Sequence, residues 1–168
     1  TSQLCLYILM CVGANTGFFS LLGSTKSHIS YVHNLTLANA YIDTNGTARY
    51  GGILAGQIGN AVMIENCHVS GYIAAEYAGG IIGTANVSNG DGYDHDYITR
   101  CSVNATVDAT VSGSGNAGGV AGRMNYGNNS NGSLTVEDCS VAGLVKAANS
   151  AGGVLGLTEC FNTANVNR

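Results

Sequence analysis

The feature that most constrains this chain is an internal repeat. Four segments share a cysteine followed by alternating aliphatic and polar residues, and they begin at Cys67, Cys101, Cys139 and Cys160. A fifth copy, at residues 35–37, has Leu in place of Cys. The first four copies in chain order are each followed by a Gly-Gly-aliphatic block, at residues 51–53, 79–83, 118–122 and 152–156. Units of this kind cannot bury an apolar face alone, so the repeat predicts stacked coils that share one core.

The residues within each copy predict strands. In Cys101-Ser102-Val103 and onward to Val107, aliphatic residues alternate with Ser, Asn and Thr, which is the period of a strand with one buried face. No stretch keeps a helical period. We expect two or three short strands per coil, with equivalent residues of successive coils about 4.8 Å apart. The sequence therefore predicts an all-β fold, a right-handed parallel β-solenoid of about four to five coils with loops projecting from one side.

The glycine pairs are expected at the tight corner of every coil, because glycine permits the close approach of another backbone. Two copies depart from the pattern. The block at residues 51–56 is one residue longer than the others, which predicts a bulge there. The last copy reaches Cys160 after a much shorter loop, which predicts a narrower final coil.

Composition excludes two classes of protein. Charged residues make up 10% of the chain against a usual ~25%, while 45% of the residues are hydrophobic, so the chain is not disordered. Its formal net charge is −4, and its six basic residues are scattered along the sequence. There is therefore no basic stripe for nucleic acid, and none is expected as a partner.

The N-terminal segment is apolar but short. Residues 5–12 are uncharged, lack a preceding basic region, and fall well below the ~20 residues of a transmembrane helix. We interpret residues 1–14 as an N-terminal strand or cap and residues 15–168 as the solenoid. Neither end has an amphipathic capping helix, so we expect a fragment of a longer solenoid or a subunit that stacks head to tail on copies of itself.

The repeat resembles a known motif. Residues 78–83 with the sequence Ala-Gly-Gly-Ile-Ile-Gly, followed after a loop by Ile98-Thr99-Arg100-Cys101-Ser102-Val103, resemble the GLUG motif of bacterial surface proteins. Residues 15–19 through 34–37 are similar to the repeat that often opens such arrays. The resemblance covers nearly everything from about residue 15. It implies an adhesin, another cell-surface protein or a non-catalytic part of a secreted peptidase, and hence an extracellular or cell-surface location.

The cysteines of the repeat are expected on the inward face. On this interpretation Cys67, Cys101, Cys139 and Cys160 form a core ladder of free thiols. Disulfide bonds between neighbouring coils and a metal site are the alternatives, since stacked Cα atoms would lie near enough to bridge.

The segments after the glycine blocks, at residues 84–98, 123–135 and 57–63, are expected to project as loops and could carry function. Asp91, Asp94 and Asp96 concentrate carboxylates around a Gly turn, which favours Ca²⁺ as the one cofactor to consider. The remaining positions of a calcium loop are missing, so an ordinary solvated loop is the alternative.

The same loops offer aromatic and amide side chains for sugars. Tyr93, Tyr97 and Tyr126 are candidate glycan contacts. Six Asn-x-Ser/Thr sequons are candidate glycosylation sites, and they begin at Asn34, Asn45, Asn86, Asn104, Asn128 and Asn131.

These observations favour a non-enzymatic extracellular module, either a surface stalk, an adhesin repeat or a filament subunit that assembles through its uncapped ends. The alternative is a carbohydrate-binding adhesin module that uses loops 84–98 and 123–135. A polysaccharide-active enzyme is the third hypothesis. It is disfavoured because the acids lie in one loop, with no second cluster to flank a substrate.

Overall fold

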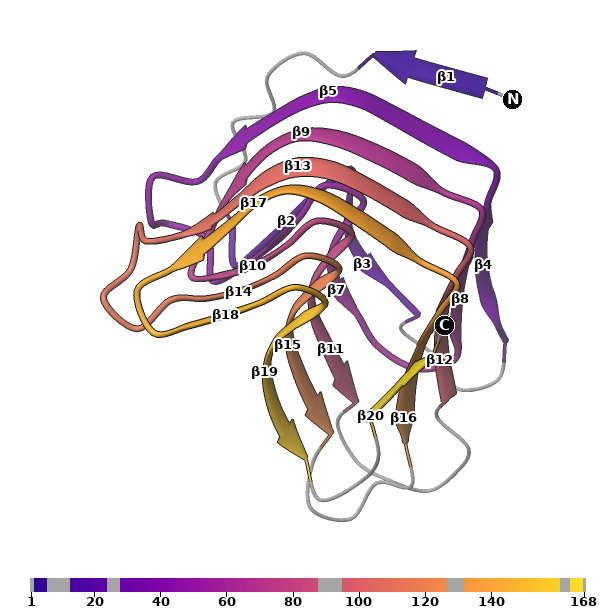
Figure 1. Cartoon of the computed structure of the whole chain (residues 1–168). Coiled ribbons are helices and arrows are strands. Elements are labelled where there is room, and N and C mark those ends of the chain that lie inside the picture. The colour runs from indigo at the N-terminus through magenta and orange to yellow at the C-terminus, as the bar shows by residue number, and fades with distance from the viewer. Residues whose placement is uncertain are drawn as a thin grey trace.

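The computed structural model describes residues 2–5, 13–23, 28–87, 95–126, 132–160 and 164–167. Within them lie twenty β-strands and no helix (Figure 1). The strands form four parallel sheets of five strands each, A to D, and every sheet takes one strand from each of five successive coils. The predicted all-β parallel solenoid is therefore confirmed.

Every coil contributes one strand to sheets A, B, C and D, in that order along the chain. Sheet A contains β1 (Ser2–Cys5), β5 (Leu35–Asp43), β9 (His68–Ala74), β13 (Ser102–Ala109) and β17 (Ser140–Ala147). Sheet B contains β2 (Asn15–Thr16), β6 (Tyr50–Gly52), β10 (Tyr77–Gly79), β14 (Asn116–Gly118) and β18 (Ser150–Gly152). Sheet C contains β3 (Phe19–Leu22), β7 (Ala55–Ile58), β11 (Ile82–Val87), β15 (Ala121–Tyr126) and β19 (Leu155–Cys160). Sheet D contains β4 (Ser30–His33), β8 (Val62–Glu65), β12 (His95–Thr99), β16 (Ser133–Glu137) and β20 (Ala164–Asn167).

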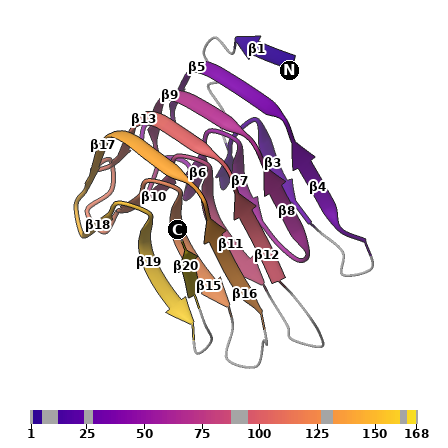
Figure 2. The same ribbon diagram turned by 45° about the vertical axis from the view of Figure 1, so that its right-hand side comes forward.

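The cross-section of a coil has two arms. Sheets A and B lie against each other in one arm, and sheets C and D form the second arm, which points downward in Figure 1. Figure 2 shows the strands of each sheet side by side in chain order. The ends of the sheet C strands and the beginnings of the sheet D strands gather at the free end of the second arm.

Each coil has four strands, so the prediction of two or three was wrong. The segments 84–98, 123–135 and 57–63, predicted as loops, supply the missing strands. Each begins within or at the end of a sheet C strand and runs into a sheet D strand. The alternation is weak there because some buried positions hold small or polar residues, such as Thr84 and Ala85.

The inward positions form apolar columns along the axis. One column in sheet D contains Val32, Ile64, Ile98, Val136 and Val166, which pair in register from β4 to β20. Ile64 and Ile98 are fully buried. Burial of each such side chain stabilises the fold by roughly 1.5–3 kcal/mol, so the columns supply most of the driving force for stacking.

The first glycine block does not contain the predicted extra residue. Gly52 pairs with Gly79, and Ala55 pairs with Ile82, so the two blocks have the same length. The glycine pair of this coil, Gly51-Gly52, is instead displaced by one position relative to the pair in the next coil.

A bulge lies elsewhere, in β5. The register between β5 and β9 shifts between Leu37 and Ala40, which leaves one extra residue on β5. Asn39 adopts a positive φ of 56° there, and its N–H donates to Ser70 Oγ at 3.0 Å. Asn tolerates this backbone region better than most residues, so the bulge is consistent with the local sequence.

The N-terminal segment joins the first coil. Of the predicted cap at residues 1–14, residues 2–5 form β1, which pairs with β5 from Ser2–Leu35 to Cys5–Ala38. Residues 6–12 lie outside the described residues. Among the residues that are described, no helix is long and apolar enough to cross a membrane.

Glycine columns allow sheets B and C to meet backbone to backbone. The glycines of one column are the last residues of sheet B strands, and those of the other column lie within sheet C strands. A Cβ atom added at Gly83 would lie 2.4 Å from the nitrogen of Gly51 and 2.8 Å from the carbonyl carbon of Tyr50. A Cβ atom at Gly79 would lie 2.7 Å from the nitrogen of Gly122. No side chain fits these contacts, which explains why the repeat requires glycine here. The columns contain Gly52, Gly79, Gly118 and Gly152 in sheet B and Gly56, Gly83, Gly122 and Gly156 in sheet C.

We predict that Gly83→Ala destabilises the protein by about 3 kcal/mol or more, because the new methyl group must push two backbones apart. Gly113→Ala is the matched control, since a Cβ atom there meets nothing within 4 Å. Its expected effect is within about 0.5 kcal/mol. Urea unfolding followed by circular dichroism measures both, and equal midpoints for the two variants would contradict the prediction.

Candidate functional site

The outer face of sheet D carries aromatic and charged side chains. Outward residues of β4, β8 and β12 pair in register, so that Tyr31, Met63 and Tyr97 form one column and His33 and Glu65 belong to the next. Tyr31 is 49% exposed and Tyr97 is 37% exposed. We call this surface the sheet D face, defined by Tyr31, His33, Met63, Glu65, His95 and Tyr97. Two hollows lie on it, on either side of the tyrosine column.

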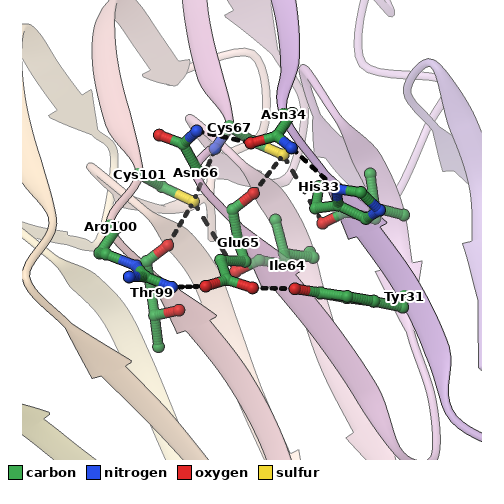
Figure 3. A network of polar contacts seen from close by, with 11 residues as sticks. Tyr31, His33, Asn34, Ile64, Glu65, Asn66, Cys67, Thr99, Arg100 and Cys101 are labelled. Atoms are coloured by element: carbon green, nitrogen blue, oxygen red, sulfur yellow. Dashed lines mark hydrogen bonds and ion pairs between the residues drawn. The ribbon is translucent and has the colours of Figure 1, made fainter.

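The first hollow is polar and lies where sheet D turns into sheet A. Its volume is about 370 Å³, and it is lined by Tyr31, His33, Asn34, Glu65, Asn66 and Arg100. These residues come from three successive coils, so the site exists only when the coils are stacked. Figure 3 shows two groups of side-chain contacts, which a backbone hydrogen bond from the Asn34 N–H to the Glu65 carbonyl oxygen joins; they comprise Tyr31, Glu65 and Arg100, and His33, Asn34 and Asn66.

Glu65 is the centre of this network. Figure 3 shows its carboxylate between Arg100 and Tyr31; one oxygen pairs with the Arg100 guanidinium and the other accepts a hydrogen bond from the Tyr31 hydroxyl. The Glu65 side chain is 19% exposed, whereas the Arg100 side chain is 64% exposed. The carboxylate therefore lies at the floor of the hollow, with its charge balanced by a guanidinium that reaches solvent.

Amide and imidazole groups extend the network toward the corner. Asn66 Nδ2 donates to Asn34 Oδ1 at 2.6 Å, and Asn34 Nδ2 lies 3.0 Å from His33 Nδ1. The His33 ring packs against the Tyr31 ring with centroids 4.6 Å apart. The rim of the hollow thus offers both donors and acceptors beside an aromatic surface.

The backbone at this corner is unusual. The residues that turn sheet D into sheet A all have positive φ, with 56° at Asn34, 50° at Asn66, 54° at Arg100 and 51° at Asp138. Asn and Asp suit this left-handed region, but Arg is uncommon in it. The turn itself requires this backbone, because all four corner residues share it, and Arg100 is the one of these four that carries a long cationic side chain, which pairs with Glu65.

The second hollow is apolar. It has a volume of about 200 Å³ and is lined by Ile29, Ala61, Val62, Met63, His95 and Tyr97. Ile29 is 69% exposed at its edge. His95 Nδ1 lies 2.7 Å from Ser133 Oγ, which holds the imidazole against the neighbouring coil. The sheet D face therefore combines a polar and an apolar hollow around two exposed tyrosines.

Of the three predicted calcium ligands, only Asp96 lies among the described residues. Asp96 is fully buried, in an inward column between Val62 and Leu134. Its oxygens accept hydrogen bonds from the Val62 N–H and the Tyr126 hydroxyl, both at 2.8 Å. Asp96 therefore links sheets C and D within the core instead of facing a solvent-exposed ion. Asp91 and Asp94 lie outside the described residues.

We predict that Asp96→Ala costs on the order of 3 kcal/mol in the free energy of unfolding, because it leaves a buried N–H and a buried hydroxyl without this acceptor. Tyr126→Phe removes only the hydroxyl and is expected to cost on the order of 1 kcal/mol. Thermal and urea unfolding of the two variants test the order. A larger loss for Tyr126→Phe than for Asp96→Ala would contradict it.

The predicted glycan contacts are separated by the structure. Tyr97 lies on the sheet D face, whereas Tyr126 is fully buried in the core and is not available to a surface ligand. Tyr93 lies outside the described residues. The sequence interpretation missed Tyr31, although Ser30-Tyr31-Val32-His33 and Asp96-Tyr97-Ile98-Thr99 share the same alternation and would align as equivalent strands.

Three of the predicted ladder cysteines form an inward column where each coil enters sheet A. Cys67 and Cys101 are buried, Cys139 is partly exposed, and all three are free thiols. The Cys67 N–H approaches Cys101 Sγ at 3.4 Å, and Cys139 Sγ donates to the Ile98 carbonyl oxygen at 3.4 Å.

Cys160 does not belong to this column. It pairs with Tyr126 in sheet C, because it follows Cys139 by only part of a coil. Strands β19 and β20 keep register with β15 and β16, so the predicted narrowing of the final coil is also wrong.

The thiols of the column differ in acidity. The hydrogen bond with Cys101 lowers the pKa of Cys139 to about 7, although burial opposes ionisation. Hydrogen bonds with both neighbours and burial raise the pKa of Cys101 itself. Cys67 also has a pKa lowered to about 7 by its hydrogen bond with Cys101, but it is inaccessible to solvent.

We predict that iodoacetamide near neutral pH modifies Cys139 on the order of tenfold faster than Cys67 or Cys101, because Cys139 alone combines exposure with a lowered pKa. Peptide mass spectrometry resolves the three sites, and the peptides with the remaining cysteines are followed separately. Equal labelling in urea serves as the control. Fast labelling of Cys101 in the folded protein would contradict the assignment.

The predicted glycosylation sites have different surroundings. Asn34, Asn45 and Asn104 are exposed, and Asn34 lines the polar hollow. Asn86 is half-buried in β11, and its Oδ1 accepts from Asn125 Nδ2 at 3.5 Å. The last two, Asn128 and Asn131, lie outside the described residues.

Within the described part of the chain, no group of three or more His, Cys, Asp or Glu side chains is placed to hold a metal ion. Comparison with known proteins adds no assignment: no family model, curated protein or solved structure matches the chain.

Proposed function

We propose that this chain is a non-catalytic structural module of an extracellular or cell-surface protein, and that its fifth coil is covered by a further coil, supplied either by another copy or by further repeats of a longer chain. It would serve as a surface stalk, an adhesin repeat region or a filament subunit. The observation that carries the proposal is the exposed core of the fifth coil. The resemblance of the glycine blocks to the GLUG motif supports the same class and the same location.

Inward residues of the fifth coil lack the cover that their counterparts have. Val103 and Val107 in β13 are 2% and 0% exposed, whereas their partners Val141 and Val145 in β17 are partly exposed. In sheet B, Ala117 is fully buried but its partner Ala151 is exposed. A further coil with the same columns would bury this surface, which favours association driven by apolar contact.

The strand edges of this coil are also available. Among the described residues, β17, β18, β19 and β20 each pair with a strand on one side only. Free edges pair readily with another chain, and contacts between unlike ends of identical subunits generate filaments. Addition of a second copy in register would therefore satisfy backbone groups and apolar columns together.

A structural role suits the thiols better than catalysis does. The column thiols point into the core, which is the position of inert packing cysteines. The acid–base network of the polar hollow, around Glu65, is held in an ion pair with Arg100. We therefore propose binding and assembly, and no reaction.

The test compares two exposed alanines of the fifth coil. Ala151 lies at the uncovered end of the core, whereas Ala142 pairs with Asn104 on the outer face of sheet A. We expect the wild type to form concentration-dependent oligomers or filaments in sedimentation and electron microscopy. Ala151→Lys should remain monomeric because a charge would be buried on stacking, and Ala142→Lys should assemble normally.

Circular dichroism confirms that both variants are folded before assembly is measured. A wild-type protein that stays monomeric at every concentration would contradict stacking on a second copy. Assembly that Ala151→Lys leaves unchanged would place the contact elsewhere on the molecule.

A further inference from the structure

The sheet D face has features of a ligand site that stacking does not use. Its residues point sideways from the solenoid, whereas stacking joins the free strand edges of the fifth coil to those of a first coil; Tyr31 lies in β4 of the first coil, but on its outward face. Tyr31 and Tyr97 stand in one column with Met63 between them, so their rings are about 9–10 Å apart along the axis. The column forms an aromatic and apolar ridge, with the polar hollow on one side and the apolar hollow on the other.

We propose that the sheet D face binds a neutral oligosaccharide, whose sugar rings stack on Tyr31 and Tyr97 and whose hydroxyl groups enter the polar hollow. This inference goes beyond the proposed stacking function. The two functions use different surfaces, so each can fail without the other.

The aromatic side chains supply the first part of the argument. Both tyrosines expose a substantial part of their side chain on a rigid strand, so little conformational entropy is lost on binding. The apolar face of a sugar ring packs on an aromatic ring in the way that other apolar groups do. The two exposed aromatic side chains are two coils apart, so they match sugar rings of an extended glycan that are separated by one further ring, which would lie over Met63.

The hydrogen-bonding groups supply the second part. A sugar hydroxyl both donates and accepts, so it requires donors and acceptors at the same place. The polar hollow offers the Glu65 carboxylate, free N–H groups of the largely exposed Arg100 guanidinium, and the amides of Asn34 and Asn66.

Charge balance decides the class of ligand. The carboxylate of Glu65 would repel a sulfate, phosphate or uronate, and the guanidinium of Arg100 would repel a cation. Because the two groups form an ion pair, their charges cancel and this pair adds no net charge to the hollow. Such a site suits a neutral ligand. The apolar hollow around Met63 and Tyr97 adds a surface for C–H or methyl groups of the same ligand.

The experiment uses the full chain produced in a host without N-glycosylation, so that Asn34 stays unmodified at the rim of the hollow. The probes are neutral linear oligosaccharides of glucose, xylose, mannose and N-acetylglucosamine, with oligogalacturonate and heparin fragments as acidic probes. An array identifies the ligand, and calorimetry measures its affinity.

The variants are Tyr31→Ala and Tyr97→Ala, with Tyr41→Ala as the matched control. Tyr41 is 48% exposed on the outer face of sheet A and stacks on Tyr72, so it equals Tyr31 in exposure but lies on another sheet. We expect each sheet D variant to lose about tenfold or more in affinity and the control to lose none. Glu65→Gln is expected to weaken binding of the neutral probe, because it breaks the pair that holds Arg100 at the hollow.

Three results would overturn the inference: no binding of any neutral probe, equal affinities for Tyr31→Ala and Tyr41→Ala, or preferred binding of the acidic probes with an affinity that falls as salt rises. Sedimentation of the same samples measures stacking independently. Intact stacking without glycan binding would refute this inference alone, and glycan binding by a strict monomer would refute stacking alone.

Discussion

The contact between the backbones of sheets B and C determines the cross-section of the whole solenoid. At that corner the glycine columns remove every side chain, so the chain turns sharply and sends sheets C and D away as a second arm. The second to fifth coils repeat the same two glycine positions, because a side chain there would separate the two sheets and displace the neighbouring coil, whereas the first coil has Gly17 and Ser20 at these positions. The apolar columns and the outward faces of all four sheets depend on that register.

The fold was predictable to the extent that its determinants are local in the sequence. Glycine blocks and alternating Val and Ile identify stacked parallel strands without any knowledge of contacts. The strands of sheets C and D were missed because their inward positions hold residues such as Ala85 and Asp96, which do not signal burial. The bulge in β5 was misplaced for a related reason: a shift in glycine position resembles an insertion when the pairing partners are unknown.

The candidate site was less predictable because it is assembled from different coils. Asp96 and Tyr97 are adjacent in sequence, but strand alternation places one in the core and the other on the surface. One acid of the cluster predicted to bind calcium therefore lies in the core, where its neighbours in the sequence give no sign of it. Tyr31 and Glu65 meet Arg100 only after two turns of the solenoid bring them together, and no local pattern marks that meeting.

The connections between sheets C and D differ in length from coil to coil. Residues 59–61 join β7 to β8, whereas residues 88–94 join β11 to β12, yet β7 pairs with β11 and β8 with β12 in register. Extra length at this corner is therefore not transmitted to neighbouring coils. The corner is accordingly a natural graft position. Foreign peptides inserted at this corner in successive coils would form a row along the solenoid axis. The insertion points of adjacent coils would lie about 4.8 Å apart, so the choice of coil would set the distance between two displayed epitopes.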